Sequence, residues 1–254
     1  DVVIPCHPKD SDSLARVIKS LDNLSNKRNI YVISPEPITL NIKQDYHFVA
    51  DSVFDDLFTI SQIKNRWEKE DDRFSHRASW VYQQLLKIFC YQKINDLTDS
   101  YFSIDADSII LRDMKLNTDK FQYCITPTEN RLQYKAVYKN LTGMNAQQRF
   151  SFVYHHMMFK KSYLSEYILH VEKLHKTSFI KALLNSMSYD NQSPCCVDWE
   201  AYANWVYTNH PEICERRNLK YKRIDFVPNE QQIESMSQSF DMISCHAWMR
   251  DKNK

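Results

Sequence analysis

Residues 101–107 read YFSIDAD, an apolar run that ends in two aspartates one residue apart. The aromatic and branched side chains at 101–104 predict a buried strand, which places Asp105 and Asp107 at its tip. Carboxylates at such a position suit hard divalent cations such as Mg²⁺ or Mn²⁺, which in turn bridge phosphate oxygens. The triplet Asp-x-Asp is also typical of surface turns, so its meaning depends on the segments around it.

The segments before this motif predict a strand, a helix and a second strand. Residues 2–5 are an apolar run ended by proline, residues 11–24 space apolar side chains as a helix does, and residues 29–34 are a second apolar run. A third strand is expected at 47–51 and another helix at 80–93. This order predicts an α/β fold with a mostly parallel sheet flanked by helices. Ligand sites in such sheets lie at the carboxyl ends of the strands.

The second half of the chain predicts fewer regular elements. Residues 115–149 are polar and are interpreted as the irregular rim of a cleft. A strand is expected at 151–154, helices at 162–175 and 199–209, and a late strand at 221–227. Repeats and low-complexity linkers are absent from the sequence, so the 254 residues are expected to form a single domain.

Charge and glycine content exclude two large classes of protein. Lys and Arg total 33 against 32 Asp and Glu, whereas nucleic-acid-binding domains are usually clearly basic. Gly143 is the only glycine in the sequence, which excludes the glycine-rich loops that bind dinucleotides or cradle phosphates. Any phosphate must therefore be bound by a metal or by side chains.

The seven cysteines are scattered, and none are spaced as C-x-x-C. This pattern is typical of reduced thiols in a cytoplasm and not of a disulfide framework or a zinc knuckle. Apolar stretches fall short of the roughly 20 residues that cross a bilayer. Asp1 leads directly into Val2-Val3-Ile4, which does not match a signal peptide. We therefore expect a cytoplasmic protein without a transmembrane segment, and whether a targeting segment was trimmed stays open.

Four short blocks together resemble a known fold family. They read WVYQQLLK at 80–87, SIDADS at 103–108, FVYHHMMF at 152–159 and DWEAY at 198–202. With the strand–helix–strand opening, these blocks resemble GT-A glycosyltransferases that carry a D-x-D motif. They are most similar to a little-characterised group found in bacterial polysaccharide clusters and in large DNA viruses. The resemblance runs from about Val2 to about His246 and implies a nucleotide-sugar donor.

The resemblance implies a metal site made of Asp105, Asp107 and His246. In GT-A enzymes the first carboxylate of D-x-D faces the ribose or the metal, and the second ligates the metal. A histidine near the C-terminus often adds a further ligand, and His246 matches it. An imidazole ligand favours Mn²⁺ slightly over Mg²⁺. The alternative is that His246 is a packed core histidine.

The resemblance also assigns residues to the donor. The first strand-to-helix loop of this fold holds the nucleotide, and its counterparts are Pro5, Cys6, His7 and Asp10. The alternative is an ordinary turn capped by Asp10 or Ser11. Gln83 and Lys87 share one helix face, where Lys87 can offset diphosphate charge, although exposed lysines are more common. His155 and His156 stand where the family usually has a small residue, and they are candidates to contact the diphosphate or the acceptor. Neighbours on a strand point to opposite faces, so only one should face the cleft.

The catalytic candidates lie at the start of the helix expected at 199–209. An inverting transfer needs a carboxylate base for the acceptor hydroxyl. GT-A enzymes place an acidic pair at such a helix start, which corresponds to Asp198 as the base and Glu200 as its neighbour. The alternative is that Asp198 caps the helix.

The sequence thus predicts a metal-dependent glycosyltransferase, inverting at the transferred sugar, that uses a nucleoside-diphosphate donor and a glycan hydroxyl as acceptor. One alternative is a nucleotidyltransferase or phosphohydrolase that uses the same carboxylates. Residues 2–9 lack the glycine-rich basic loop that nucleotidyltransferases usually carry, which ranks this alternative lower. A second alternative is a carbohydrate-binding domain without activity. The sequence indicates neither the sugar nor the oligomeric state.

Overall fold

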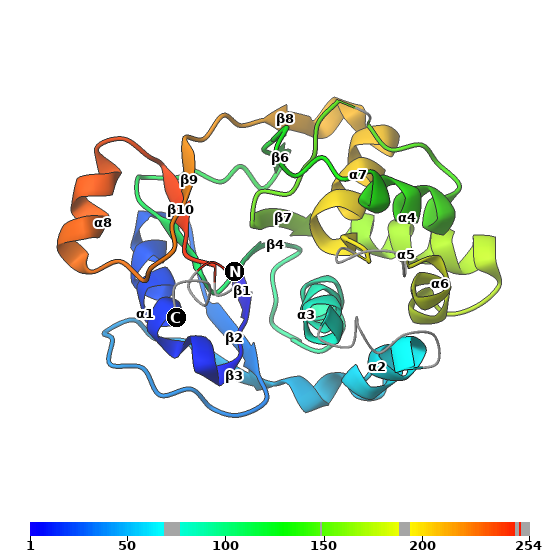
Figure 1. Ribbon diagram of the computed structural model, residues 1–254, viewed down its shortest axis with the longest axis horizontal. Coiled ribbons are helices and arrows are strands. Elements are labelled where there is room, and N and C mark those ends of the chain that lie inside the picture. Colours follow the sequence, from blue (N-terminus) through cyan, green and yellow to red (C-terminus); the bar gives the residue numbers. More distant parts are fainter. Residues whose placement is uncertain (69–76, 148, 188–193, 247–248, 250–254) are drawn as a thin grey trace.

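The computed structural model describes residues 1–68, 77–147, 149–187, 194–246 and 249, and a five-stranded sheet lies at its centre (Figure 1). The strands follow the order β3-β2-β1-β4-β7, and neighbours pair in parallel except for the antiparallel pair β4 and β7. Because β4 lies between β1 and β7, the residues that follow it lie at the carboxyl edge of the sheet next to the end of β1. The strand bounds are β1 Val2–Pro5, β2 Ile30–Ser34, β3 His47–Ala50, β4 Ser100–Ile104 and β7 His156–Lys160.

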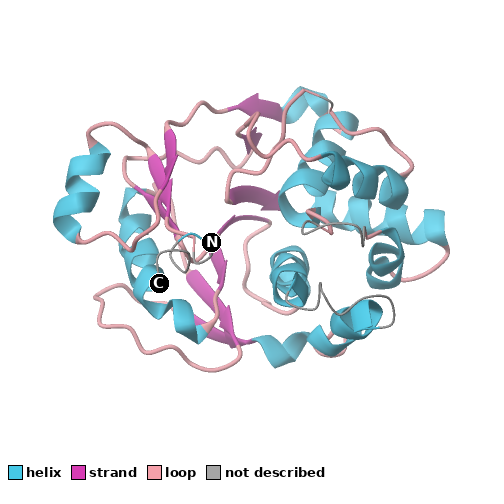
Figure 2. Ribbon diagram, viewed as in Figure 1, coloured by secondary structure: helices cyan, strands magenta, loops and turns pink. Residues whose placement is uncertain are grey.

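Helices cover both faces of this sheet because its inner strands are apolar on both faces. Side chains alternate along a strand, so Val3 packs into one core with Leu85 while Val2 packs into the other with Leu14. Leu85 belongs to α3 and Leu14 to α1, and Figure 2 shows the strands between these two helices. The helix bounds are α1 Ser11–Ser20 and α3 Ala78–Phe89.

Helices α4 to α7 lie together on the right of Figure 1, whereas α1 and α8 lie on the left. Gly143 ends α4 with a φ of 74°, the left-handed conformation that glycine adopts without strain. A π-helical turn, Val197–Ala201, leads directly into α7. The remaining helix bounds are α2 Ile60–Glu68, α4 Leu132–Thr142, α5 Lys161–His175, α6 Phe179–Ser186, α7 Tyr202–Asn209 and α8 Glu230–Ser237.

Two smaller sheets join distant parts of the chain. In the first, β10 pairs antiparallel with β5 and parallel with β9. In the second, β6 and β8 pair in parallel. The β5–β10 pair brings the end of the described chain beside the segment that follows β4. Among the described residues, none of the helices has the length and apolar character needed to span a bilayer. The bounds are β5 Ser108–Ile110, β6 Phe121–Tyr123, β8 Cys214–Arg216, β9 Tyr221–Arg223 and β10 Met242–Ser244.

The predicted α/β class with a mostly parallel sheet is confirmed, and two local predictions are wrong. The strand expected at 151–154 is absent from the described structure there, because Ser151 makes only an isolated bridge with Thr126 and β7 begins at His156. The segment 115–149 is not irregular throughout, since it contains β6 and α4. The late strand is also shorter than expected and ends at Arg223. Disulfides are absent among the described residues, which include all seven cysteines.

Candidate active site

Asp105 and Asp107 lie at the carboxyl end of β4, an inner strand of the five-stranded sheet. The backbone N–H of Ser108 donates to the carbonyl of Asp105 at 3.0 Å and closes a tight turn before β5. The backbone N–H of Asp105 donates to the carbonyl of His155, also at 3.0 Å. Both carboxylates are largely buried, with side-chain exposures of 16% for Asp105 and 21% for Asp107. Two acidic groups are therefore held at the sheet edge where α/β proteins bind ligands.

His246 contacts the second of these carboxylates from the other end of the chain. Its Nδ1 lies 3.0 Å from Oδ2 of Asp107, and the backbone N–H of Cys245 donates to the Asp107 carbonyl at 2.8 Å. Pairing of β10 with β5 causes this contact, because it sets Ser244 opposite Ser108. Burial is the largest single effect on the pKa of His246 and lowers it, but the charge and hydrogen bond of Asp107 together with the charge of Asp105 outweigh burial and raise the pKa above its ordinary value. The structure thus brings together the three residues predicted as metal ligands.

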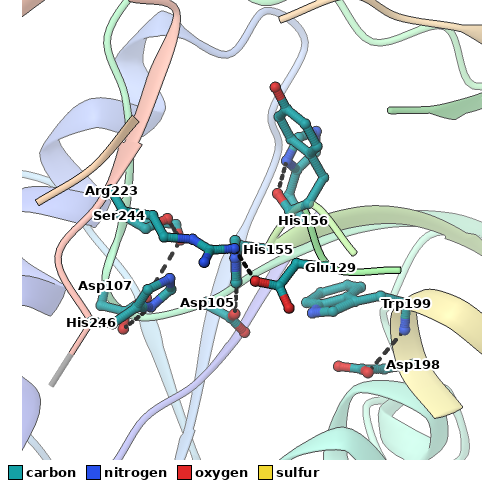
Figure 3. Close-up of polar contacts among 12 residues, drawn as sticks. Asp105, Asp107, Glu129, His155, His156, Asp198, Trp199, Arg223, Ser244 and His246 are labelled. Atoms are coloured by element: carbon teal, nitrogen blue, oxygen red, sulfur yellow. Dashed lines mark hydrogen bonds and ion pairs between the residues drawn. The ribbon is translucent and has the colours of Figure 1, made fainter. Parts of the chain in front are cut away.

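His155 and His156 diverge, as expected for neighbouring residues (Figure 3). Nδ1 of His155 lies 3.1 Å from Oδ2 of Asp105, and its ring centroid lies 4.4 Å from that of His246. The ring of His156 instead packs beside Phe102, and its Nδ1 contacts the Tyr154 carbonyl at 2.9 Å. Burial lowers the pKa of both rings, to about 3 for His156. Only His155 therefore joins Asp105, Asp107 and His246, which together we call the acidic cluster.

Lys87 is completely enclosed and pairs with two carboxylates. Its Nζ lies 2.5 Å from Oδ1 of Asp105 and 2.9 Å from Oδ2 of Asp198, and only 2% of the side chain is exposed. The ammonium also lies 3.9 Å from the centre of the Trp199 ring, which suits a cation–π contact. Burial lowers the pKa of Lys87, but the two carboxylates outweigh burial and raise it. The alternative of an exposed lysine is wrong. Gln83, which shares its helix face, is half-buried.

Asp198 and Glu200 lie in the π-helical turn and are both about 1% exposed. Oδ1 of Asp198 accepts a hydrogen bond from the Trp199 backbone N–H at 2.9 Å, and the turn has no side-chain cap among the described residues. Burial raises the pKa of both carboxyls, and for Asp198 the positive charge of Lys87 opposes this effect. Glu200 accepts hydrogen bonds from the Ser151 hydroxyl at 2.6 Å and the Phe152 N–H at 2.9 Å. Glu200 thus fixes the segment that precedes β7.

The loop predicted to hold the nucleotide lies beside the acidic cluster. Pro5 ends β1, and Cys6 follows with 8% exposure. Burial raises the pKa of the Cys6 thiol to about 12, and the negative charges of Asp10 and Asp107 add to this effect. Nδ1 of His7 accepts a hydrogen bond from the Lys9 N–H at 3.3 Å and caps a short 3₁₀ turn. The local turn is thus capped by His7, and the side chain of Asp10 makes no cap hydrogen bond to α1 among the described residues.

Three residues that adjoin this cluster were not among the predicted site residues. Arg223 of β9 forms an ion pair with Glu129, and the charge of Arg223 opposes protonation of His246 (Figure 3). Oε1 of Gln84 accepts a hydrogen bond from the Val197 N–H at 2.7 Å and ties α3 to the π-helical turn. The only available signal for Glu129 was its place in the segment predicted as a cleft rim. Gln84 lies beside Gln83 on the helix expected before the D-x-D motif, and the sequence carried no signal for Arg223.

The residue types at the cluster suit a divalent cation. Among the described residues, no three His, Cys, Asp or Glu side chains form a ready-made ion site, because each imidazole is hydrogen-bonded to a carboxylate instead. An ion would replace these hydrogen bonds. Nε2 of His155 is buried and has no hydrogen-bond partner among the described residues. The two carboxylates of Asp105 and Asp107 and the imidazole of His246 supply the oxygen and nitrogen donors that suit such an ion.

Solved structures with a similar fold include glycosyltransferases. The chain matches apo xyloside xylosyltransferase 1 from mouse with a TM-score of 0.53 and 9% identity, covering 98% of each chain. It matches galactosyltransferase LgtC, solved with donor and acceptor sugar analogues, with a TM-score of 0.51 and 11% identity, covering 97% of this chain and 87% of that one. An active-site variant of LgtC gives 0.52 and 12%, covering 99% and 93%.

The chain therefore has the GT-A fold, with a mostly parallel central sheet flanked by helices. Identities near 10% establish the fold and not the reaction. No protein-family model matches the sequence, and no curated protein matches it.

Proposed function

We propose that the chain is a glycosyltransferase that moves a sugar from a nucleoside-diphosphate donor to a glycan hydroxyl. A divalent ion, Mn²⁺ or Mg²⁺, would be bound by Asp105, Asp107 and His246. The fold shared with a xylosyltransferase and a galactosyltransferase supports this reaction class. The observation that carries the proposal is the 3.0 Å contact between His246 and Asp107, residues 139 positions apart. It assembles oxygen and imidazole donors at the ligand-binding edge of the sheet.

The residues around the cluster take complementary roles in this proposal. When bound, the ion supplies Lewis-acid stabilisation of the departing diphosphate. The loop from Pro5 to Asp10 lies beside Asp107, and we assign it to the nucleotide. Arg223 carries a guanidinium that matches phosphate oxygens in geometry and charge. Lys87 holds Asp105 in place through the 2.5 Å contact.

For Asp198 we propose two roles, which one experiment separates. The first is the role predicted from the sequence, the base that takes the acceptor proton in an inverting transfer. The second is that of an anion that holds Lys87 next to Asp105, and the 1% exposure of Asp198 and its 2.9 Å contact with Lys87 favour it. Asp198→Asn should abolish transfer without weakening donor binding if Asp198 is the base. It should weaken donor binding as well if Asp198 positions Lys87. An NMR spectrum showing a retained anomeric centre in the product would exclude the base role.

Metal-dependent nucleotide binding tests the central claim. We expect UDP or GDP to bind the wild-type chain in the presence of Mn²⁺ in a calorimetric titration and not after chelation. Asp107→Ala should lose this binding, whereas Asp113→Ala, at an exposed carboxylate shortly after β5, should retain it. Unchanged nucleotide affinity in Asp107→Ala would refute the metal assignment.

Product analysis separates the reaction classes. A glycosyltransferase incubated with Mn²⁺, a nucleotide sugar and an acceptor releases a nucleoside diphosphate. A phosphohydrolase that uses the same carboxylates cleaves within the diphosphate and releases a nucleoside monophosphate and a sugar 1-phosphate, whereas a nucleotidyltransferase moves the nucleoside monophosphate to the acceptor and releases the sugar 1-phosphate. These products have distinct ³¹P NMR signals. A panel of nucleotide sugars, ranked by the rise they cause in melting temperature, selects the donor for this assay.

A further inference from the structure

Three side chains of α3 form a line that leads out of the site. Trp80, Gln84 and Lys87 are spaced i, i+4 and i+7, so they lie on one face of the helix. Lys87 contacts Asp198, and Gln84 accepts the Val197 N–H, so this face lies along the π-helical turn. Trp80 is about two helical turns from Lys87, which places it roughly 10 Å away along the helix axis.

The direction of this line follows from two contacts of Lys87. Its carbonyl accepts a hydrogen bond from the Tyr101 hydroxyl at 2.7 Å, whereas its Nζ reaches Asp105, four residues further along the chain. Helical side chains point toward the N-terminus of their helix, so α3 runs antiparallel to β4. The N-terminal turn of α3 therefore lies past the tip of β4, and Trp80 lies on the side of the sheet where α/β proteins bind ligands.

Trp80 is half-buried and has an aromatic and a basic neighbour. Its ring centroid is 6.2 Å from that of Tyr134 on α4, and the guanidinium carbon of Arg77 lies 5.8 Å from the centre of the Trp80 ring. A partly exposed indole offers an apolar surface that suits the C–H face of a sugar ring. A guanidinium next to it suits a carboxylate.

Two basic side chains at this place have unsatisfied nitrogens. Nε of Arg77 and Nζ of Lys135, which follows Tyr134 on α4, are both buried and lack hydrogen-bond partners among the described residues. Lys135 is only 6% exposed. Burial lowers its pKa, and the charge of Glu200 opposes this effect. A buried ammonium without a hydrogen bond is costly, so a bound anion would stabilise it.

Glu200 does not satisfy Lys135 because its own oxygens have other partners. Oε2 accepts hydrogen bonds from the Ser151 hydroxyl and the Phe152 N–H, and Oε1 accepts one from the Asn204 amide at 3.1 Å. The lysine ammonium is therefore left with its N–H groups available. Its flexible four-carbon stem lets it turn to meet a ligand on the indole without a movement of α4.

We propose that Trp80, Arg77 and Lys135 form an acceptor subsite for an acidic sugar. The sugar ring packs on the indole, and its carboxylate pairs with the two cations. This inference rests on the proposed function, because it names the class of glycan that serves as acceptor. Since Trp80 lies about two helical turns from Lys87, the acidic sugar is a neighbour of the residue that accepts the transferred sugar.

Ligand-observed NMR titrations test the inference with four sugars as probes. Glucuronate and galacturonate carry the carboxylate, and glucose and galactose are their uncharged matches. We expect the wild-type chain to bind each uronate at least about tenfold more tightly than its match, because hydrogen bonds between charged groups are strong. Lys135→Met keeps an unbranched side chain and should lose most of this preference. Trp80→Leu should weaken the binding of all four sugars.

Two further variants complete the comparison. Lys139→Met is the matched control, because Lys139 is exposed one turn further along α4 and should not affect the preference. Arg77→Met removes the second cation at a half-buried position and should reduce the preference, which keeps the test decisive if Lys135→Met does not fold. Equal wild-type affinity for the uronates and their uncharged matches overturns the inference. A preference that persists in both Lys135→Met and Arg77→Met also overturns it.

Nucleotide titrations with Mn²⁺ separate this inference from the proposed function. If the nucleotide binds with Mn²⁺ but the uronates are not preferred, the subsite fails and the transferase proposal stands. If the preference for uronates depends on Lys135 but the nucleotide does not bind, the subsite stands. The transferase proposal then fails, and the chain is a carbohydrate-binding domain for acidic sugars.

Discussion

The buried ion pairs of Lys87 make the most direct test of the site's energetics. Lys87→Met keeps an unbranched side chain of similar length and removes the ammonium that lies 2.5 Å from Asp105 and 2.9 Å from Asp198. Asp198 is 1% exposed, so water cannot replace the lost partner. The variant therefore leaves a buried carboxylate without its counter-charge. Such a group is costly in the protein interior.

The expected loss of stability is large because the pair is fully enclosed. Removing one partner of a buried ion pair typically costs about 3–5 kcal/mol. For a domain near this size, roughly 2–4 °C of melting temperature corresponds to each kcal/mol, so we expect Lys87→Met to melt about 6–20 °C lower. The double variant Lys87→Met/Asp198→Asn removes the stranded charge as well. It should recover much of the loss, since the Asn oxygen can still accept the Trp199 N–H bond.

Urea unfolding followed by circular dichroism measures these free energies. Lys93→Met is the matched control, because its Nζ contacts Asp56 at a similar 2.6 Å but Asp56 is 64% exposed, and exposed pairs contribute little. We expect the control to lose far less stability than Lys87→Met. The reasoning is refuted if both lysine variants unfold at the same urea concentration, or if the double variant is no more stable than Lys87→Met.

Three further predictions concern residues outside the proposed metal site. Burial lowers the pKa of His156 from 6.5 to about 3. Between these two pH values the unfolded chain binds a proton that the folded chain excludes. The free energy of unfolding should therefore fall by up to about 1.4 kcal/mol per pH unit as the pH drops through this range. His156→Gln should show a shallower slope in urea titrations at several pH values, and an identical slope would contradict this. Gly143→Ala should lower the free energy of unfolding, measured by calorimetry, by about 1 kcal/mol, because alanine is strained at a φ of 74°. The added Cβ would lie at an ordinary 3.6 Å from Leu174, so no steric clash contributes. An unchanged free energy would contradict the cap assignment. Asn229→Ala should lose about 1 kcal/mol, since its side chain caps α8 by accepting the Gln232 N–H at 2.9 Å, and unchanged urea unfolding would show that α8 contributes nothing to the transition.

The central sheet could be predicted from the sequence because its inner strands carry strong local signals. Strands β1 and β2 are buried along their whole length and read as continuous apolar runs, with a proline at or just after the end of each. The helical spacing of Tyr134, Val137, Tyr138 and Leu141 was an equally local signal for α4. The many polar residues between them led to the interpretation of a loop.

The boundary of β7 could not be predicted from local pattern, because a distant side chain decides it. Residues 152–159 are apolar or aromatic except for His155 and His156, and any part of this run could have been the strand. Glu200 accepts hydrogen bonds from the Ser151 hydroxyl and the Phe152 N–H, which tie the start of this run to the π-helical turn. The positive φ of His155 then separates that anchored part from β7. The strand begins only at His156.

The contact partners of the site residues also could not be predicted from local sequence patterns. The sequence assigned Lys87 to the diphosphate, since a lysine near a D-x-D motif offers a positive charge. The structure pairs it instead with Asp198, which lies 111 residues away. His246 was found only through a family resemblance. The β5–β10 pairing that brings it to Asp107 consists of three residue pairs, and strands this short give a weak signal in the sequence.

The charges at the cluster give a physical reason to expect a cation there. Asp105 and Asp198 share the single ammonium of Lys87, and Glu129 already pairs with Arg223. Asp107 pairs with the imidazole of His246, which carries a positive charge only when it is protonated. With four carboxylates against two permanent cations, the cluster is net negative and would repel a diphosphate at short range. The chain also lacks a glycine-rich loop whose backbone N–H groups could replace a cation. A nucleotide should therefore bind here only together with a divalent ion, and measurable binding after chelation would show that the donor lies elsewhere.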